Sequence, residues 1–428
     1  MDDAQRVAAG YRPLSEADLP RYLAGLPGMA DRLGGPPAGW TVREVGDGNL
    51  NLVFIVKGPA GGVAVKQALP YVRLVGESWP LPLSRAHYEQ MALAEQARLV
   101  PGRTPAIRHY DERLALIVME LLEPHVIMRR GMIAGTRYPA FAAEIADFMA
   151  RTLYFTSDLA LTAAAKKDRV GAFAGNHALC KITEDLIFTD PYRVAANNRW
   201  TSPELDDIAA AFREDLDLHV AVSRLKLKFL SAAEAMLHGD LHTGSIMVTE
   251  AETRVIDPEF AFYGPMGFDI GAVIANLLLN YLSQPGHETE PGGRRAYQRW
   301  VLDTVGEVWS RFRDDFLALW RANPTGDAYP PDLFQGMAGA ARLEEERQAF
   351  MDRLWRDTVG FAAAKMIRRI LGLAHNLDLE SIPDRRLKAA AETAALGMAR
   401  TMMVETERFP SVDAILARAE AAGASVRA

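Results

Sequence analysis

The sequence has almost no cysteine: Cys180 is the only one among 428 residues. A single thiol excludes an intramolecular disulfide and a cysteine-based metal cluster, because both need more than one cysteine. The apolar stretch "IGAVIANLLLNYL" at 270–282 is too short to span a bilayer and predicts a buried helix. The beginning of the chain is polar and acidic and lacks the basic start and apolar run of a signal peptide. We therefore expect a cytoplasmic protein without a membrane anchor.

The sequence also lacks an excess of positive charge. It has 48 Lys and Arg residues against 55 Asp and Glu residues, a formal net charge of −7. This balance argues against a nucleic acid or an anionic membrane as the main partner. A small anionic ligand remains compatible with it, because local Arg and Lys groups suffice to bind one. The composition, 24% charged and 49% hydrophobic, is ordinary for a globular protein. The length of 428 residues predicts two or three domain-sized units, or one enzyme with two lobes.

The first 122 residues predict a small α+β lobe. Short helices are expected over 14–34, with Ser15 as an N-cap. The β-branched runs "WTVREV", "NLVFIVKG" and "GVAVKQA" predict an antiparallel meander, and "AIRHYD" and "LALIVMELL" predict two further strands. Between these groups, "PLSRAHYEQMALAEQARLV" predicts one helix with Ser84 as a cap. Residues 123–428 have apolar residues at three- and four-residue spacing, which predicts a large helical lobe.

A glycine-rich turn joins the first two predicted strands at "GDGNLNLVF". Small residues let backbone N–H groups approach phosphate oxygens, so Gly46, Asp47, Gly48 and Asn49 are candidate nucleotide-binding residues. By itself the turn is equally typical of an ordinary hairpin.

Lys66 lies on the third predicted strand, in "VAVKQ". Alternation along the strand directs its side chain away from the face of the neighbouring valines. A lysine one strand after a glycine-rich turn is typical of the kinase lysine that binds the phosphates of ATP. The following helix offers Glu89 or Glu95 as its ion-pair partner, and we prefer Glu89.

The segment "HGDLHTGS" at 238–245 contains an Asp in the context of a kinase catalytic loop, H-x-D-x-x-x-x-N. Asp240 is therefore the candidate catalytic residue, but Ser245 stands where such loops have a metal-binding Asn. Asp257 follows 17 residues after Asp240, and Glu259 follows Asp257 in "DPEF". Because proline favours an extended backbone, we expect both carboxylates to face one Mg²⁺ ion. Glu259 would then replace the missing Asn ligand.

The motifs "GDGNLNLVF", "GESWPLP", "HGDLHTGS", "DPEFAFYGPMGFDIGA" and "KMIRRILGLAH" resemble those of bacterial 5-methylthioribose kinase. That family is similar to the choline kinases and aminoglycoside phosphotransferases. The resemblance covers residues 12–405 and implies a bilobal protein-kinase-like fold and a homodimer. It implies transfer of phosphate from ATP, with Mg²⁺, to the 1-hydroxyl of S-methyl-5-thioribose in methionine salvage.

The resemblance also assigns roles to individual residues. Asp240 becomes the catalytic acid, Lys66 a phosphate ligand, and Asp257 and Glu259 the metal ligands. The nucleotide-binding hinge lies near Glu120 and Leu122, and the substrate site includes Asp240, Trp79, Arg368 and Arg369. From the residues alone, adjacent arginines on a helix point about 100° apart and are usually surface charges. Only the resemblance places Arg368 and Arg369 in the site.

Two alternatives remain open from the sequence. The first is another small-molecule kinase of the same group, acting on an aminoglycoside, choline or homoserine. The second is a non-catalytic, nucleotide-binding scaffold with a kinase-like fold. Retention of Lys66, Asp240 and Asp257 argues against the scaffold.

Overall fold

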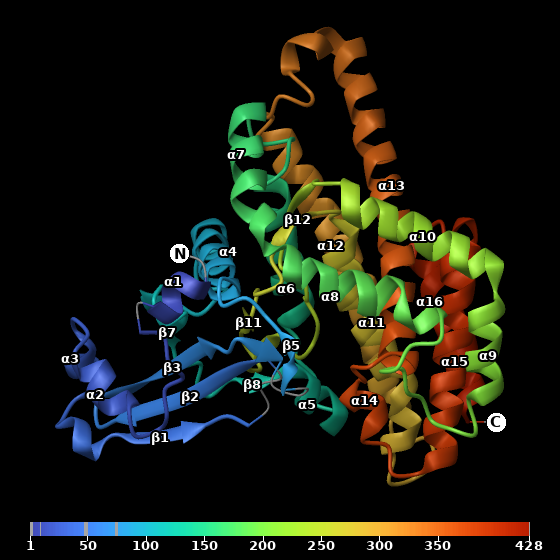
Figure 1. Ribbon diagram of the computed structural model, residues 1–428. Helices are drawn as coiled ribbons and strands as arrows, with labels where there is room; N and C mark the ends of the chain where they lie inside the picture. Colours follow the sequence, from blue (N-terminus) through green and yellow to red (C-terminus); the bar gives the residue numbers. More distant parts are fainter. Residues whose placement is uncertain (1–2, 9, 47–49, 73–75, 428) are drawn as a thin grey trace. The chain divides into compact units, whose positions relative to one another are not determined.

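A computed structural model describes residues 3–8, 10–46, 50–72 and 76–427 of the chain, drawn as a ribbon in Figure 1. The chain divides into two compact units. The first unit consists of Met1–Pro124, Gly175–Leu179 and Arg254–Ala261. The second unit consists of His125–Ala174, Cys180–Thr253 and Phe262–Ala428. One unit is rich in strands and the other is mainly helical, so the prediction of an α+β fold with two lobes is confirmed.

The first unit is built on a five-stranded antiparallel sheet in the order β1-β2-β3-β7-β6. Its strands are β1 (Thr41–Glu44), β2 (Asn51–Gly58), β3 (Gly61–Ala68), β6 (Ile107–Asp111) and β7 (Leu116–Glu120), with a smaller pair, β4 (Tyr71–Val72) and β5 (Gly76–Pro80). Its helices are α1 (Asp3–Ala8), α2 (Leu19–Ala24), α3 (Met29–Leu33), the short η1 (Pro37–Gly39) and α4 (Arg85–Leu99).

The two faces of this sheet have different neighbours. Val63 and Val65 of β3 are fully buried in a core with Leu19 of α2 and Leu33 of α3. Strand alternation places Lys66 on the other face, where α4 contacts β3, β6 and β7. The alternating pattern of "VAVKQ" therefore separates the core side chains from the lysine.

Two of the predicted helix caps are wrong. α2 begins at Leu19, and Ser15 instead donates from its N–H and its hydroxyl to Asp18, at 2.8 and 2.7 Å. Ser84 does precede α4, but its side chain makes no capping hydrogen bond. The reason is its helical backbone, φ −61° and ψ −15°, whereas a capping side chain needs an extended backbone.

The second unit is built around a helix that is buried along its whole length. This helix, α11 (Gly267–Ser283), contains the predicted core segment and contacts α12 (Arg295–Ala322), α13 (Gly336–Leu371), α15 (Arg385–Val404) and α16 (Val412–Val426). The other α-helices are α5 (Met128–Ala134), α6 (Phe141–Phe155), α7 (Ala163–Phe173), α9 (Asp206–Glu214), α10 (Leu216–Ser231) and α14 (Leu377–Glu380).

Short elements complete the chain. The strand pairs of the second unit are β8 (Val126–Ile127) with β10 (Ile246–Val248), and β9 (Ala235–Leu237) with β12 (Phe262–Gly264). Elements with residues in both units are η2 (Ala174–Asn176), α8 (His177–Phe188) and β11 (Thr253–Val255). The remaining short helices are η3 (Asp190–Tyr192), η4 (Gln284–His287), η5 (Pro331–Phe334) and η6 (Thr406–Arg408). Among the helices that the structure describes, none has both the length and the apolar composition that crossing a membrane requires.

Candidate active site

Lys66 of the first unit lies between two carboxylates. Its Nζ is 2.9 Å from the carboxylate of Glu89 on α4 and also contacts the carboxylate of Asp257. Glu95, the alternative partner, pairs with Arg98 of its own helix instead. The structure therefore selects Glu89 as the helix partner of the lysine, as we preferred from the sequence.

Glu259 is buried in the same unit and is held by three side chains. Asn51 Nδ2 donates to Glu259 Oε2 at 2.8 Å, and Arg85 Nε lies 3.5 Å from the same oxygen. Asn176 Nδ2 donates to the backbone carbonyl of Glu259 at 2.9 Å. These contacts fix the carboxylate in one orientation, which is a requirement for a metal ligand.

Glu89, Asp257 and Glu259 form a carboxylate cluster whose ligand oxygens all lie within 4.8 Å of one another. Burial raises the pKa of Glu89 to about 8, and the charges of Asp257 and Glu259 add to this against the effect of Lys66. Burial also raises the pKa of Glu259. A divalent cation would stabilise the two buried carboxylates, Glu89 and Glu259, as anions, and Mg²⁺ prefers oxygen ligands. The donor set of the cluster fits Mg²⁺.

The backbone at Asp257 differs from the prediction. Its φ is +67°, in the left-handed region, whereas we expected an extended "DPE" segment. Ala261 N–H donates to the carbonyl of Pro258 at 3.1 Å, so the chain turns here. Asn176 holds this turn by donating to the carbonyls of both Glu259 and Ala261. The two carboxylates are brought together by a turn, at a backbone cost of about 1–3 kcal/mol for a non-glycine residue.

The glycine-rich turn is described only in part. Gly46 lies in a turn after β1. Asp47, Gly48 and Asn49 lie outside the described residues, so their role in nucleotide binding stays a prediction.

The predicted hinge residues lie at the end of β7. Glu120 is its last residue, and its carboxylate accepts a hydrogen bond from the N–H of Ala106 at 3.0 Å. Leu122 is buried, and Trp79 is half-buried on β5. The roles of these residues in ligand binding stay predictions.

Asp240 of the second unit lies in the catalytic loop, residues 238–245, between β9 and β10. Asp269 of α11 anchors this loop by accepting hydrogen bonds from the N–H groups of His238, at 2.6 Å, and Gly239, at 3.1 Å. Gly239 has a φ of +83°, a conformation that side chains rarely adopt. The turn that presents Asp240 therefore requires a glycine at this position.

Each oxygen of the Asp240 carboxylate has a different basic neighbour. His242 Nε2 lies 3.2 Å from Oδ2, and Lys365 Nζ lies 3.5 Å from Oδ1. Gly244 N–H donates to His242 Nδ1 at 2.9 Å, so we assign the proton of the imidazole to Nε2. Burial lowers the pKa of His242 to about 3, so the ring is neutral at physiological pH and donates this proton to Asp240.

The charge of Asp240 is set by these neighbours. Burial by itself raises the pKa of a carboxyl group, but His242, Lys365 and Arg369 hold the pKa of Asp240 well below its usual range. Because His242 is neutral above about pH 3, it contributes a hydrogen bond, and the basic side chains contribute the charge. Asp240 is therefore an ionised acceptor suited to orienting a hydroxyl group.

Arg368 and Arg369, at the end of α13, are not surface charges. Arg369 is buried and Arg368 is half-buried. Both donate from Nη1 to the carbonyl of Ala374, at 3.2 and 3.3 Å. From the 100° between adjacent helix positions we expected at most one of the two to aim at a given atom, and this is wrong here because the chain after α13 returns over the end of the helix. Their buried Nε atoms have no hydrogen-bond partner among the described residues.

The comparisons with known proteins agree with this geometry. The phosphotransferase enzyme family matches residues 41–314. "Methylthioribose kinase 2" of Oryza sativa subsp. japonica is 45% identical over 96% of this chain and 97% of that protein. "Methylthioribose kinase" of Escherichia coli O45:K1 is 45% identical over 97% and 99%. The chain belongs to the methylthioribose kinase family.

Solved structures are more distant from this kinase. A choline/ethanolamine kinase family protein from Mesorhizobium loti is 16% identical, with a TM-score of 0.39, and covers 95% of this chain and 99% of its own. A likeness at this level does not bear on the substrate of the enzyme.

Sequence reasoning missed several side chains that hold the catalytic loop of the kinase. These side chains include Asp269, Lys365 and Arg129. Arg129 donates from Nε to Thr243 Oγ1 at 3.2 Å, and the same Nε lies 3.4 Å from the carboxylate of Asp378. Asp269 and Lys365 stand within the quoted motifs "GFDIGA" and "KMIRRI", and that position was their only signal. Arg129 had no signal in the sequence, because each arginine of the "MRRG" segment is indistinguishable from a surface charge.

Ser245, which stands where related loops have Asn, is buried near the imidazole of His242. Its hydroxyl lies 3.4 Å from His242 Nδ1, and its N–H donates to the carbonyl of His242 at 2.8 Å. The hydroxyl is thus directed at the loop itself. That Glu259 supplies the metal ligand in place of this residue stays a prediction.

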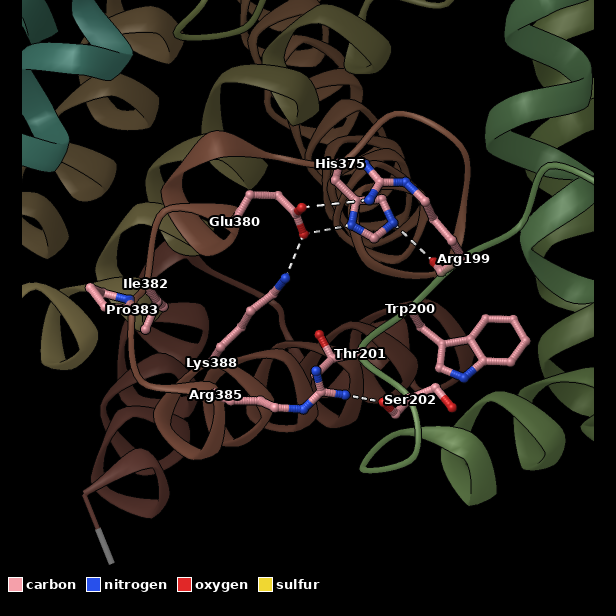
Figure 2. Close-up of a pocket in the computed structure, with 10 residues that line it drawn as sticks. All are labelled: Arg199, Trp200, Thr201, Ser202, His375, Glu380, Ile382, Pro383, Arg385 and Lys388. Atoms are coloured by element: carbon pink, nitrogen blue, oxygen red, sulfur yellow. Dashed lines mark hydrogen bonds and ion pairs between the residues drawn. The ribbon is translucent and has the colours of Figure 1, made fainter.

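A cavity of about 370 Å³ lies beside the segment that follows the two arginines (Figure 2). Its lining includes His375, which directly follows Ala374, and Glu380. The basic groups in it are already paired: Lys388 and His375 with Glu380, and Arg385 with Glu204. Arg199 also lies 3.5 Å from Glu380, so the basic side chains of this cavity already have acidic partners.

Proposed function

We propose that the enzyme transfers the γ-phosphoryl group of ATP to the 1-hydroxyl of S-methyl-5-thioribose, a step of methionine salvage. Two curated relatives at 45% identity over nearly the whole chain are methylthioribose kinases. The observation that carries the proposal at the site is the charge around Asp240. Dependence on ATP supports the cytoplasm as the location.

The surroundings of Asp240 disfavour a cationic acceptor. The charge of Asp240 acts on four basic groups, the buried Lys365 and Arg369 and the half-buried Arg368 and Arg129. These would repel the quaternary ammonium of choline or the ammonium groups of an aminoglycoside, whose recognition needs aromatic or acidic surroundings. A neutral sugar enters such a site without this penalty, and its phosphorylated product is stabilised by the same charges.

The first unit supplies the groups for the nucleotide. Lys66 is placed to bind a phosphate oxygen, with Glu89 orienting its ammonium group. Asp257 and Glu259 would hold Mg²⁺, which when bound neutralises phosphate charge. Asn51 and Arg85 keep the carboxylate of Glu259 in place, and the left-handed turn at Asp257 sets the direction of the other carboxylate.

The second unit supplies the groups for the acceptor. Ionised Asp240 accepts a hydrogen bond from the sugar hydroxyl and takes up its proton as the sugar oxygen bonds to the γ-phosphorus and the bond from that phosphorus to the departing oxygen of ADP breaks. The Nε–H groups of Arg368 and Arg369, which have no partner within the part of the chain that the structure describes, are donors for the oxygens of a sugar or of a phosphoryl group. The transfer is then catalysed by position and charge, as phosphoryl transfer generally is.

The direct test is product analysis with ATP, Mg²⁺ and S-methyl-5-thioribose, with the phosphate located by phosphorus NMR. We expect one product phosphorylated at the 1-hydroxyl. Parallel reactions with choline, homoserine and an aminoglycoside should show at most background ATP consumption. Phosphorylation of one of these in preference to the thioribose would overturn the proposal.

We also propose that the enzyme is a homodimer, paired through α10. Leu216, Val220, Leu227 and Leu230 are exposed on this helix, and with Ser223 they follow the alternating four- and three-residue spacing of a self-pairing helix. Leu216, Val220 and Leu227 line an apolar groove of about 530 Å³. The helix begins with acidic residues and ends with basic ones, so an antiparallel second copy complements its charge.

Leu227→Glu is the test of this interface, because a buried charge in a paired helix is strongly unfavourable. We expect the mass from light scattering to fall from two chains to one. Val194→Glu, at another exposed valine of the second unit, is the control and should leave the mass unchanged. A monomeric wild-type protein, or a dimeric Leu227→Glu variant, would exclude this interface.

A further inference from the structure

Lys365 of α13 is a buried lysine at the catalytic carboxylate. Its side chain is 4% exposed, and its Nζ lies 3.5 Å from Asp240 Oδ1. The same ammonium group lies 4.0 Å from the centre of the Phe268 ring, on α11. Among the described residues it makes no conventional hydrogen bond, in contrast to Lys166, which is also buried and donates to Asp158 at 2.6 Å.

The charged groups that face Lys365 come from three elements. Asp240 is on the catalytic loop, Asp269 on α11, and Arg368 and Arg369 on its own helix. Asp269 is occupied by the backbone N–H groups of the loop, so Asp240 is the carboxylate that interacts directly with the ammonium. A buried lysine that is weakly paired is unfavourable for folding. Such groups are concentrated at functional sites, where a perturbed charge has a role.

We propose that Lys365 is a positioning residue for phosphoryl transfer, whose ammonium fixes Asp240 Oδ1 while His242 fixes Oδ2. This inference rests on the proposed role of Asp240 in the kinase reaction. With His242 at one oxygen and the ammonium group of Lys365 beside the other, the plane of the carboxylate is set, and with it the direction in which the acceptor hydroxyl is held. The positive charge also keeps Asp240 ionised beside its arginines.

A pH dependence follows from this placement. Burial lowers the pKa of Lys365 to about 8, with Asp240 and Asp269 opposing the effect and the two arginines adding to it. The protonated form is the one that holds Asp240, so turnover should be full below pH 8 and fall as the pH rises through it. His242, with a pKa of about 3, does not titrate in this range. Glu89 of the first unit does, so the lysine must be identified by substitution.

The experiment is the pH profile of kcat and KM from pH 6 to 10 for the wild type, Lys365→Arg and Lys365→Met. We expect the alkaline fall of the wild type to disappear in Lys365→Arg, because a guanidinium stays charged throughout this range. Lys365→Met should lose about 10- to 100-fold in kcat at pH 7, with the KM for ATP unchanged and no alkaline fall. Lys166→Met is the control: its melting temperature should fall, and its pH profile should match the wild type.

Chemical rescue is a second test, and it does not depend on whether an arginine or methionine side chain fits at position 365. Lys365→Ala should regain kcat saturably with methylammonium, while Lys166→Ala should not respond. An alkaline fall that persists unchanged in the Arg and Met variants would overturn the inference, because a group other than Lys365 would then be titrating. Absence of rescue in a folded Lys365→Ala protein would also overturn it. If the wild type transfers no phosphate to the thioribose, the proposed substrate fails first, and the same profiles on the true acceptor still test Lys365.

Discussion

The two units of the enzyme arrange buried charge in opposite ways. In the first, three carboxylates surround one lysine, and burial among neighbouring carboxylates raises the pKa of Glu89 to about 8. In the second, basic side chains surround one carboxylate, and the pKa of Asp240 is held well below its usual range. Burial by itself would raise the pKa of both acids, so burial does not distinguish them. The sign of the neighbouring charges distinguishes the two acids. Negative neighbours in the first unit favour a cation there, and positive neighbours in the second unit favour anionic oxygens.

The largest effect should come from removing the single carboxylate of the basic cluster. Asp240→Asn keeps the shape but loses the charge, and we expect turnover to fall by about two to four orders of magnitude. Binding of ATP, measured by titration calorimetry, should be nearly unchanged because the carboxylate cluster is intact. Asp352→Asn, at an exposed position of α13, serves as the matched control. Turnover above a tenth of the wild type would remove Asp240 from its catalytic role.

The next effect should come from weakening the carboxylate cluster. Glu259→Ala deletes a charged oxygen ligand, so we expect severe loss of activity and a much higher Mg²⁺ requirement. Ser245→Ala should be far milder, because a neutral hydroxyl is a poor ligand for a divalent cation. The measurement is turnover against Mg²⁺ concentration at saturating sugar and ATP.

Loss of packing must be separated from loss of the ligand in that experiment. Glu259→Gln keeps an acceptor for Asn51 and removes only the charge, so it should fold like the wild type and still need more Mg²⁺. If Ser245→Ala proves more damaging than Glu259→Ala, Glu259 does not replace the Asn of related loops.

The lysine in the carboxylate cluster should matter for the nucleotide and not for the sugar. Lys66→Met leaves phosphate charge and three carboxylates without their ammonium, so the KM for ATP should rise and turnover should fall. The KM for the sugar should stay within about twofold of the wild type. Lys57→Met, at an exposed lysine on β2, is the control. Unchanged kinetics for ATP would show that this face of the sheet does not bind the nucleotide.

The smallest effects should come from single substitutions in the basic cluster. Arg368→Ala and Arg369→Ala should each raise the KM for the sugar or slow transfer by about 10- to 100-fold, the usual range for a hydrogen bond to a charged group. Each variant leaves the other arginine on the carbonyl of Ala374, so the melting temperature should change little. Arg386→Ala, at an exposed position of α15, is the control. Wild-type kinetics in both variants would mean that the pair only holds the chain after α13.

Local sequence patterns predicted much of the first unit and little of how the second holds its catalytic loop. The alternation in "VAVKQ" was enough to separate Lys66 from the core valines. The sequence offered both Glu89 and Glu95 as partners of the lysine, and the structure confirms the preference for Glu89. The same kind of reasoning failed for Ser15 and Ser84, because a cap depends on where the helix begins and on one backbone angle.

The sequence by itself determined the candidates for the chemistry: the lysine on its strand, the aspartate in its loop and the pair of acids around a proline. Tertiary structure alone decided what surrounds them. Asn51 and Glu259 are 208 residues apart, and a left-handed turn at Asp257 aims the second carboxylate where an extended segment was expected. Lys365 and Arg129 reach the catalytic loop from separate helices. A periodic pattern records which face of an element is buried, but the charges that meet there come from elements distant in the chain, and those charges set each pKa.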